Sequence, residues 1–258
     1  MRAAFFGGIY SNWLALEAAI TDAKRRGAEA LYCLGDLGGF GPHPDRAIEI
    51  LREARIVTVQ GNYDDSVGNG KIDCGCGYTD PRDNHFARIS YEYTLEHTSQ
   101  AHRPWLASLP PRVAFEVEGK RYALVHGSPR QQNEFLWESA SPDALLEKLA
   151  SDAAADVLLC THTGIPWQRR LPSGRRVANV GALGRPANDG RTEVWYALLD
   201  TVRAEPFELV PVAYDHLGLA AEMRAERLPE EFVETILTGW WTTCLEILPA
   251  RERLRGRF

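Results

Sequence analysis

The stretch IVTVQGNYDD, residues 56–65, places a polar cluster directly after a short apolar run rich in β-branched residues. Such a run favours a buried strand, so Asn62, Tyr63 and Asp64 are expected at the carboxyl end of that strand. The same arrangement occurs at three other places in the chain: Gly35-Asp36, His126-Gly127-Ser128 and Thr161-His162-Thr163 each follow an apolar run. In open α/β sheets ligands collect at the carboxyl ends of strands, so these four polar clusters are expected to converge in space.

Short apolar runs alternate with amphipathic helical patterns along the rest of the chain, which indicates an α/β protein. The expected helices span 13–26, 45–54, 82–98, 100–109 and 142–150, and the chain is expected to be helical from about 215. The expected strands span 3–6, 31–34, 56–60, 113–117, 121–125, 156–160, 177–180, 193–199 and 206–212, with one more near Arg169. The glycine-rich segment 61–81 is expected to form a long, functional loop.

The bulk composition is that of an ordinary globular protein. A chain of 258 residues with 45% hydrophobic residues can bury a substantial core, and we expect one domain over 1–214 with a helical extension over 215–258 packed on it. The net charge of −6 disfavours a nucleic-acid partner. No segment approaches the roughly 20 apolar residues that cross a bilayer. Five cysteines without disulfide-scaffold spacing favour a reducing compartment, so we expect a cytoplasmic protein. A homo-oligomer is one expected assembly.

The polar residues that follow the strands form a mixed oxygen and nitrogen donor set. Taken singly, Asp36 reads as a turn residue, Asn62 as a left-handed turn residue, and His126 or His162 as a hydrogen-bonded core histidine. Taken together, one carboxylate, one amide oxygen and two imidazoles suit Mn, Fe or Zn better than Ca or Mg. A metal ion held there polarises a phosphoryl oxygen and lowers the pKa of a bound water.

The order of these motifs resembles that of the calcineurin-like metallophosphoesterases, most closely their small bacterial and archaeal phosphodiesterase-like branch. The resemblance runs from residue 2 to about residue 200 and includes the late segment Asn179-Val180-Gly181-Ala182-Leu183-Gly184-Arg185-Pro186. It implies an α/β fold in which two mixed β-sheets form a sandwich flanked by helices. It also implies a metal-dependent phosphodiesterase or phosphatase that acts on a small phosphate ester.

The resemblance further implies a ligand set for one metal and the loss of another. Asp36, Asn62, His126 and His162 match the ligands of one of the family's two ions, and Asp36 matches the residue that bridges both. The other ion's remaining ligands are replaced by Gly8, Tyr10 and Gly164. A glycine-only, positive-φ backbone at Gly8 would make an aspartate difficult to restore there. We therefore expect about one transition-metal ion per chain, or two if other residues rebuild the altered site.

The resemblance to the family also implies catalytic roles for Asn62, Tyr63, Asp64 and Arg130. Tyr63 stands where the family has an acid-donating histidine, and a tyrosine with a pKa near ~10 donates a proton poorly at neutral pH. Its two interpretations are a hydrogen bond to a phosphoryl oxygen and a packing aromatic. Arg130 and Arg185 are candidates for charge stabilisation, although Arg185 reads more simply as a surface arginine.

Additional metal ligands are expected from Cys74, Cys76, Asp64 or His85 if a second site is rebuilt. The simpler interpretation of Cys74 and Cys76 is a flexible loop with two free thiols. Trp240 and Trp241 read as core-packing or dimer-contact residues in an apolar C-terminal helix, rather than as residues that stack on a substrate base.

The sequence thus predicts a metal-dependent phosphoesterase with one complete and one degenerate metal site. The alternative is a non-catalytic metal- or ligand-binding regulatory protein on the same scaffold, which the three missing ligands favour. A nucleic-acid enzyme is disfavoured by the negative charge.

Overall fold

Two five-stranded mixed sheets form the centre of the computed structural model, which describes residues 1–203 and 205–253. The first sheet has the order β10-β9-β1-β2-β3 and is built from β1 (Arg2–Phe6), β2 (Ala30–Cys33), β3 (Val57–Thr58), β9 (Val194–Asp200) and β10 (Phe207–Val212). The second has the order β4-β5-β6-β8-β7 and is built from β4 (Arg112–Val117), β5 (Lys120–Val125), β6 (Val157–Cys160), β7 (Trp167–Arg170) and β8 (Arg176–Asn179). Strands β1, β2 and β3 are parallel to one another, as are β5, β6 and β8.

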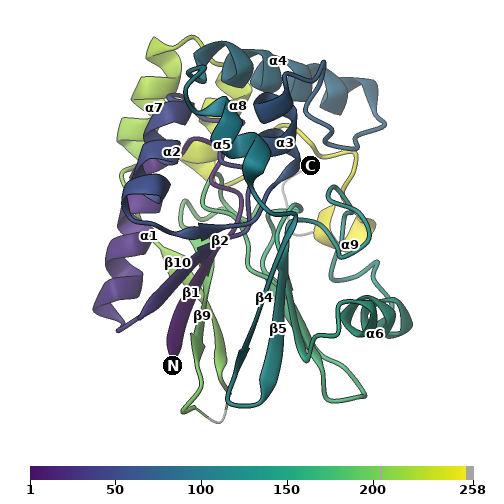
Figure 1. Cartoon of the computed structure of the whole chain (residues 1–258). Coiled ribbons are helices and arrows are strands. Elements are labelled where there is room, and N and C mark those ends of the chain that lie inside the picture. The colour runs from purple at the N-terminus through teal and green to yellow at the C-terminus, as the bar shows by residue number, and fades with distance from the viewer. Residues whose placement is uncertain (204, 254–258) are drawn as a thin grey trace.

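Helices flank both sheets, so the predicted two-sheet sandwich is confirmed. Figure 1 shows α1 and α2 with α7 on one side of the strands and α6 on the other. The helices of the described residues are α1 (Trp13–Arg25), α2 (Pro44–Glu53), α3 (Asn62–Asn69), α4 (Pro81–His97), α5 (Arg103–Ser108), α6 (Asp143–Asp152), α7 (His216–Ala225), α8 (Glu230–Thr238) and α9 (Ala250–Arg253).

Side chains alternate between the two faces of each sheet, so each sheet contributes to two hydrophobic cores. In β1, Ala3 and Phe5 face the core between the sheets, whereas Ala4 and Phe6 face the core beneath the outer helices. In β5, Leu124 faces the core between the sheets and Val125 faces the core beneath α6. Successive side chains of a strand point to opposite faces, so each strand contributes to both layers of packing. Fully burying one such large apolar side chain contributes about 1.5–3 kcal/mol.

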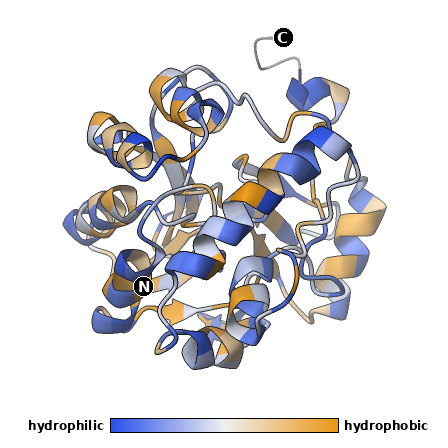
Figure 2. Cartoon of the chain, turned by 90° about the horizontal axis from the view of Figure 1, so that it is seen from above, coloured by the Kyte–Doolittle hydropathy of each residue, from blue (hydrophilic) through white to orange (hydrophobic). Residues whose placement is uncertain are grey.

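The parallel strands end together at one end of the molecule. In Figure 1, β1 rises from the N-terminus toward the end that is covered by α3, α4, α5 and α8. Figure 2 looks down on the molecule from above and shows helices around its edge and a long helix across its middle, with hydrophilic and hydrophobic residues in each. The loops that follow β2, β3, β5 and β6 therefore open into the same region beneath these helices.

Two sequence expectations are wrong. The segment 61–81 is not one continuous loop, because α3 begins at Asn62 and ends at a left-handed Gly70 with φ 62°. Acidic residues in the first turn of that helix favour its formation. Trp240 and Trp241 are not helical, since α8 ends at Thr238 and Gly239 follows with φ 74°.

The C-terminal helices pack against the rest of the chain. Phe232 of α8 lies against Phe40 with a ring-centroid distance of 4.6 Å, and Trp13 of α1 donates a hydrogen bond of 2.9 Å to Glu222 of α7. The division into a domain over 1–214 and an extension over 215–258 remains a prediction, and residues 254–258 lie outside the described part. None of the helices that the structure describes is long and apolar enough to cross a membrane.

Candidate metal centre

Three side chains from three different loops meet at the carboxyl ends of the strands. Oδ2 of Asp36 lies 3.1 Å from Nε2 of His126, and the same nitrogen lies 3.1 Å from Nδ1 of His162. All three residues are buried, and their ligand atoms lie within 4.8 Å of one another. Asp36 follows β2, His126 follows β5 and His162 follows β6, so the predicted convergence of these residues is what the structure has.

The backbone of this region is held in unusual conformations. Asp36 has φ 55° and His162 has φ 39°, a left-handed region that residues other than glycine rarely adopt. Strained conformations of this kind persist where the surrounding structure fixes them, commonly at functional sites. Gly61 makes the approach possible, because a Cβ at that position would lie 2.2 Å from Oδ1 of Asp36. Only a glycine allows the start of α3 to pass so close to Asp36.

Asp64 fixes the loop that carries Asp36. Its two carboxylate oxygens accept hydrogen bonds from the backbone N–H groups of Asp36 (2.9 Å), Leu37 (2.9 Å) and Gly61 (2.8 Å). With three backbone donors bound, the Asp64 carboxylate holds the loop of Asp36 in place. Asp64 is also absent from the cluster of close ligand atoms among the described residues, so the structure gives it a positioning role.

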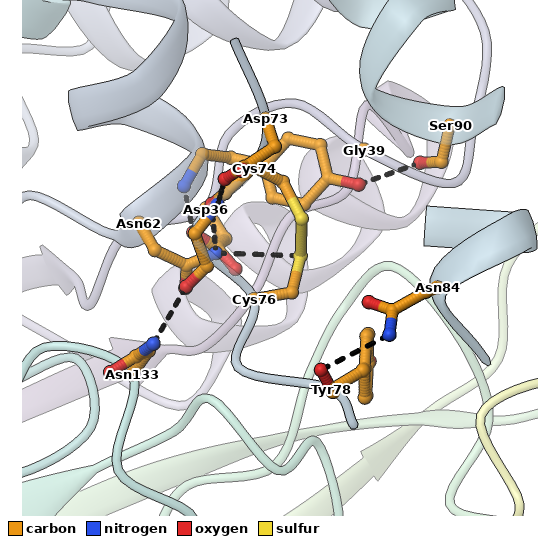
Figure 3. Close-up of a disulfide and its surroundings, with 12 residues drawn as sticks. Asp36, Gly39, Asn62, Asp73, Cys74, Cys76, Tyr78, Asn84, Ser90 and Asn133 are labelled. Carbon is orange, nitrogen blue, oxygen red and sulfur yellow. Dashed lines mark hydrogen bonds between the residues drawn. A yellow bond between two sulfur atoms is a disulfide. The ribbon is translucent and has the colours of Figure 1, made fainter. Parts of the chain in front are cut away.

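Asn62 lines the same cavity as Asp36 and His162 and offers an amide oxygen. Its Nδ2 donates to the carbonyl oxygen of Cys74 at 2.9 Å, which fixes the orientation of the amide. Its Oδ1 is buried and has no hydrogen-bond partner among the described residues. Figure 3 shows Asn62 beside Asp36 and the bond between Cys74 and Cys76. A buried acceptor without a donor is costly, so an electropositive group is expected to face it.

The charge state of the cluster suits a cation. Burial would raise the pKa of Asp36, but the adjacent His126 holds this pKa below its usual value. Burial and the charge of His126 lower the pKa of His162 to about 3, so its imidazole is neutral at pH 7. Nδ1 of His126 lies 2.7 Å from the carbonyl oxygen of Leu34. Burial would lower the pKa of His126, but the adjacent Asp36 raises it, so the proton on Nε2 is the one that a bound metal ion would displace. Nδ1–H keeps its hydrogen bond to the carbonyl and orients the ring.

The distances also fit a single ion. Two ligand atoms bound at about 2.1 Å to one ion are roughly 3.0–3.5 Å apart in tetrahedral or octahedral geometry. The observed separations of 3.1 Å between Asp36 and His126, and between His126 and His162, fall in that range. With the unpartnered oxygen of Asn62, the residues present fit a mixed oxygen and nitrogen site for a divalent transition metal.

The region of the three missing ligands is filled by an aromatic ring. A Cβ on Gly8 would lie 2.5 Å from Cζ of Tyr10, and a Cβ on Gly164 would lie 3.8 Å from Oη of Tyr10. Tyr10 is buried and its hydroxyl faces the carbonyl oxygen of His162 at 3.5 Å. Gly164 has φ 73°, whereas Gly8 is not among the positive-φ glycines. The backbone obstacle to restoring a ligand therefore lies at Gly164 and not, as expected, at Gly8.

The model of the calcineurin-like phosphoesterase superfamily domain matches residues 1–204 of this chain. The chain belongs to the calcineurin-like phosphoesterase superfamily. Membership supports phosphoric ester hydrolase activity that depends on metal. The recognition of this family from the motifs is thereby confirmed.

Relatives extend the similarity along nearly the whole chain. The chain is 27% identical over 251 residues to the uncharacterized protein MJ0912 of Methanocaldococcus jannaschii, covering 92% of this chain and 97% of the relative. A crystal structure of a metallophosphoesterase from Sphaerobacter thermophilus shares 27% identity with a TM-score of 0.71, covering 93% of this chain and 99% of that one. The hypothetical protein PH1004 of Pyrococcus horikoshii OT3 shares the fold at 23% identity, with a TM-score of 0.77 and the same coverage of both chains.

The other expected site residues make different contacts from those predicted, although Cys76 lines the same cavity as Asp36. Cys74 and Cys76 form a disulfide and are buried, which contradicts the flexible loop with two free thiols and leaves no thiolate to bind a metal. His85 is exposed on α4 and packs against the ring of Phe86. Arg130 is exposed and pairs with Glu134 through a hydrogen bond of 2.9 Å, and it does not line the cavity beside Asp36.

Tyr63 lies in the wall of that cavity. Its backbone N–H donates to Oδ1 of Asp36 at 2.9 Å, and its hydroxyl donates to Oγ of Ser90 at 2.9 Å. Burial raises the pKa of this phenol well above its usual value. The side chain is therefore a poor acid in place of the family's histidine.

The sequence named Arg185 as a candidate for charge stabilisation or a surface arginine, and Trp241 as a packing residue, but it did not predict that the two residues pair. Arg185 is buried rather than on the surface, and its guanidinium carbon lies 3.5 Å from the ring centroid of Trp241. Trp241 comes from the segment after α8, outside the residues that the family model matches. The only signal in the sequence was the presence of Arg185 in the late loop.

Proposed function

We propose that this protein hydrolyses a phosphate ester with one divalent transition-metal ion, Mn, Fe or Zn, held by Asp36, Asn62, His126 and His162. The observation that carries this proposal is the buried cluster of three ligand atoms beside the unpartnered oxygen of Asn62. When bound, the ion would polarise a phosphoryl oxygen and lower the pKa of a water. In the net reaction a bond forms between the water oxygen and phosphorus, and the ester bond breaks to release an alcohol.

The chain's own residues prepare this chemistry. The backbone N–H groups around Asp36 bind Asp64 and so hold Asp36 in a fixed orientation. His126 is oriented by the carbonyl of Leu34, and His162 is kept neutral by burial and by His126. Preorganised ligands need no rearrangement when charge develops on the phosphoryl group.

We propose a single ion because the ligands of the family's other ion are replaced by Gly8, Tyr10 and Gly164. Tyr10 fills the space between Gly8 and Gly164, so the pair of ions that clamps attacking and leaving oxygens in two-metal enzymes has only one complete ligand set. The same observation favours the alternative, a non-catalytic protein that binds a metal or ligand on this scaffold.

Elemental analysis and a hydrolysis assay separate these functions. We expect about one Mn, Fe or Zn per chain and release of p-nitrophenol from p-nitrophenyl phosphate or from its bis ester. Both should be lost in His126→Ala. A folded, metal-loaded protein that hydrolyses neither ester would favour the binding protein, and a protein that holds no transition metal would contradict the proposal.

A further inference from the structure

Arg185 carries a buried charge that no acidic side chain neutralises. The residue is 7% exposed and forms no ion pair with an acidic side chain in the described part of the chain. Its guanidinium contacts the side chain of Cys244, but its Nε has no hydrogen-bond partner among the described residues. Burying an ionised group without a partner of opposite charge is expensive. A guanidinium in this state is expected to bind an anion that is not part of the chain.

The cavity that Arg185 lines is the one beside the candidate metal centre. It has a volume of about 60 Å³, and its walls include Asp36, Asn62 and His162 together with Tyr10 and Arg185. A water-sized group needs roughly 10–15 Å³ of such space, so the cavity has room for about one phosphoryl group. The guanidinium and the metal ligands therefore border the same small space.

The guanidinium also lies at the altered metal site, where Gly8, Tyr10 and Gly164 replace the family's ligands. Nε of Arg185 lies 3.8 Å from the position of a Cβ on Gly164, which is the same distance as Oη of Tyr10 from that position. Tyr10 fills the space over Gly8, and the guanidinium carbon lies 5.9 Å from the Tyr10 ring centroid. A fixed organic cation thus lies where the scaffold has lost the ligands of a metal cation.

Trp241 holds the guanidinium in place. Its ring lies 3.5 Å from the guanidinium carbon, its Nε1 donates to the carbonyl oxygen of Pro186 at 2.7 Å, and its backbone N–H donates to Asn188 at 2.9 Å. These contacts tie the segment after α8 to the loop that carries Arg185. Stacking on an aromatic ring stabilises the cation, and the Nε–H, which has no partner among the described residues, stays available to an anion.

We propose that Arg185 replaces the lost metal ion as the second positive group of the site, binding two oxygens of a terminal phosphate that enters the cavity beside Asp36 and His162. This inference rests on the proposed function. The planar guanidinium offers parallel N–H groups that match two phosphoryl oxygens. The small cavity favours a phosphomonoester, whose phosphate carries only one organic substituent, over a diester.

Isothermal titration of the metal-loaded protein with inorganic phosphate tests the role of Arg185. We expect phosphate to bind at least about tenfold more weakly to Arg185→Gln than to the wild type, with intermediate binding by Arg185→Lys. The matched control is Arg191→Gln, because Arg191 also lies over a tryptophan, at 5.4 Å from Trp195, but is exposed and paired with Asp189. Arg191→Gln should bind phosphate within about twofold of the wild type, and all variants should keep the same metal content.

The outcomes distinguish this inference from the proposed function. Unchanged phosphate affinity in a folded Arg185→Gln variant would overturn the inference while the metal and hydrolysis results stand. Arg185-dependent phosphate binding by a protein that holds no metal would refute the proposed function, and with it the role of Arg185 as a second positive group, while Arg185 would remain a phosphate ligand. If Arg185→Gln does not fold, the Nε–H resonance of Arg185 in the wild type gives the answer. This resonance should move during a phosphate titration, and a stationary resonance would refute the inference.

A separate binding measurement tests whether the cavity prefers a phosphomonoester to a diester. Dimethyl phosphate, a small diester, should bind at least about tenfold more weakly than inorganic phosphate to the wild type. Equal affinities would contradict the monoester while leaving the Arg185 comparison intact.

Discussion

The carboxylate of Asp64 accepts a hydrogen bond of 2.9 Å from the backbone N–H of Asp36, so one acidic residue positions another without sharing a ligand role. Asp64 also binds the N–H groups of Leu37 and Gly61. The loop after β2 and the start of α3 are therefore joined through one side chain.

Replacing this carboxylate should weaken the metal site. Asp64→Asn presents an NH₂ group to backbone donors, so we expect a loss of roughly 2 kcal/mol in the free energy of unfolding. We also expect metal affinity to fall by about 10–100-fold, the usual cost of removing a group that orients a ligand. Metal titration and thermal unfolding measure both effects. The control is Asp65→Asn, whose side chain pairs with Lys71 at the surface and should change neither value appreciably.

The two histidines should act as ligands. His126→Ala and His162→Ala should each abolish metal retention while the protein remains folded, as judged by elemental analysis and circular dichroism. The exposed His97 provides the control, and His97→Ala should retain the wild-type metal content. A His162→Ala protein that still holds one ion per chain would show that the ligand set is wrong.

Removing the hydroxyl of Tyr63 distinguishes its two interpretations, a hydrogen bond to a phosphoryl oxygen and a packing aromatic. The hydroxyl donates to Ser90 and its pKa is raised by burial, so we expect Tyr63→Phe to keep kcat within about threefold. The lost hydrogen bond should cost roughly 1 kcal/mol of stability. A fall in kcat of more than about tenfold at unchanged metal content would instead give the phenol a catalytic role.

The lost metal site should be recoverable only when its cation substitute is removed. Gly8→Asp, Tyr10→His and Gly164→His restore the family's ligands, but Arg185 would remain beside the new site. We expect this triple variant to bind about one ion, and the addition of Arg185→Gln to raise the content to about two. The positive φ of Gly164 should cost roughly 1–3 kcal/mol of stability in both. Two ions in the triple variant alone would show that Arg185 does not exclude the metal.

The disulfide should support Asn62. Thiol titration of the denatured, unreduced protein should find three free cysteines, Cys33, Cys160 and Cys244. Cys74→Ser/Cys76→Ser frees the segment whose carbonyl orients the Asn62 amide, so metal affinity should fall by roughly tenfold. Five titratable thiols would contradict the disulfide, and unchanged affinity would show that Asn62 is held without it.

The fold and the centre of the site were predictable because their signals are local. Asp36, His126 and His162 each follow an apolar run, and the ends of parallel strands meet at one edge of a sheet. Arg185 was not predictable in the same way. Its burial depends on Trp241, which is 56 positions further along the chain and returns to the loop through tertiary packing alone. The burial and pairing of Cys74 and Cys76 likewise depend on how the segment after α3 folds over Asn62.

The wall of the cavity has consequences for how such proteins diverge. Phe232, Thr243 and Cys244 line the cavity together with Asp36, yet they follow the last residue that the family model matches. Substitutions in this segment alter the shape of the cavity without touching any candidate metal ligand. Two descendants of one ancestor can thus keep identical ligand motifs and still evolve to accept different esters. The substitutions that cause this difference would lie in the C-terminal segment.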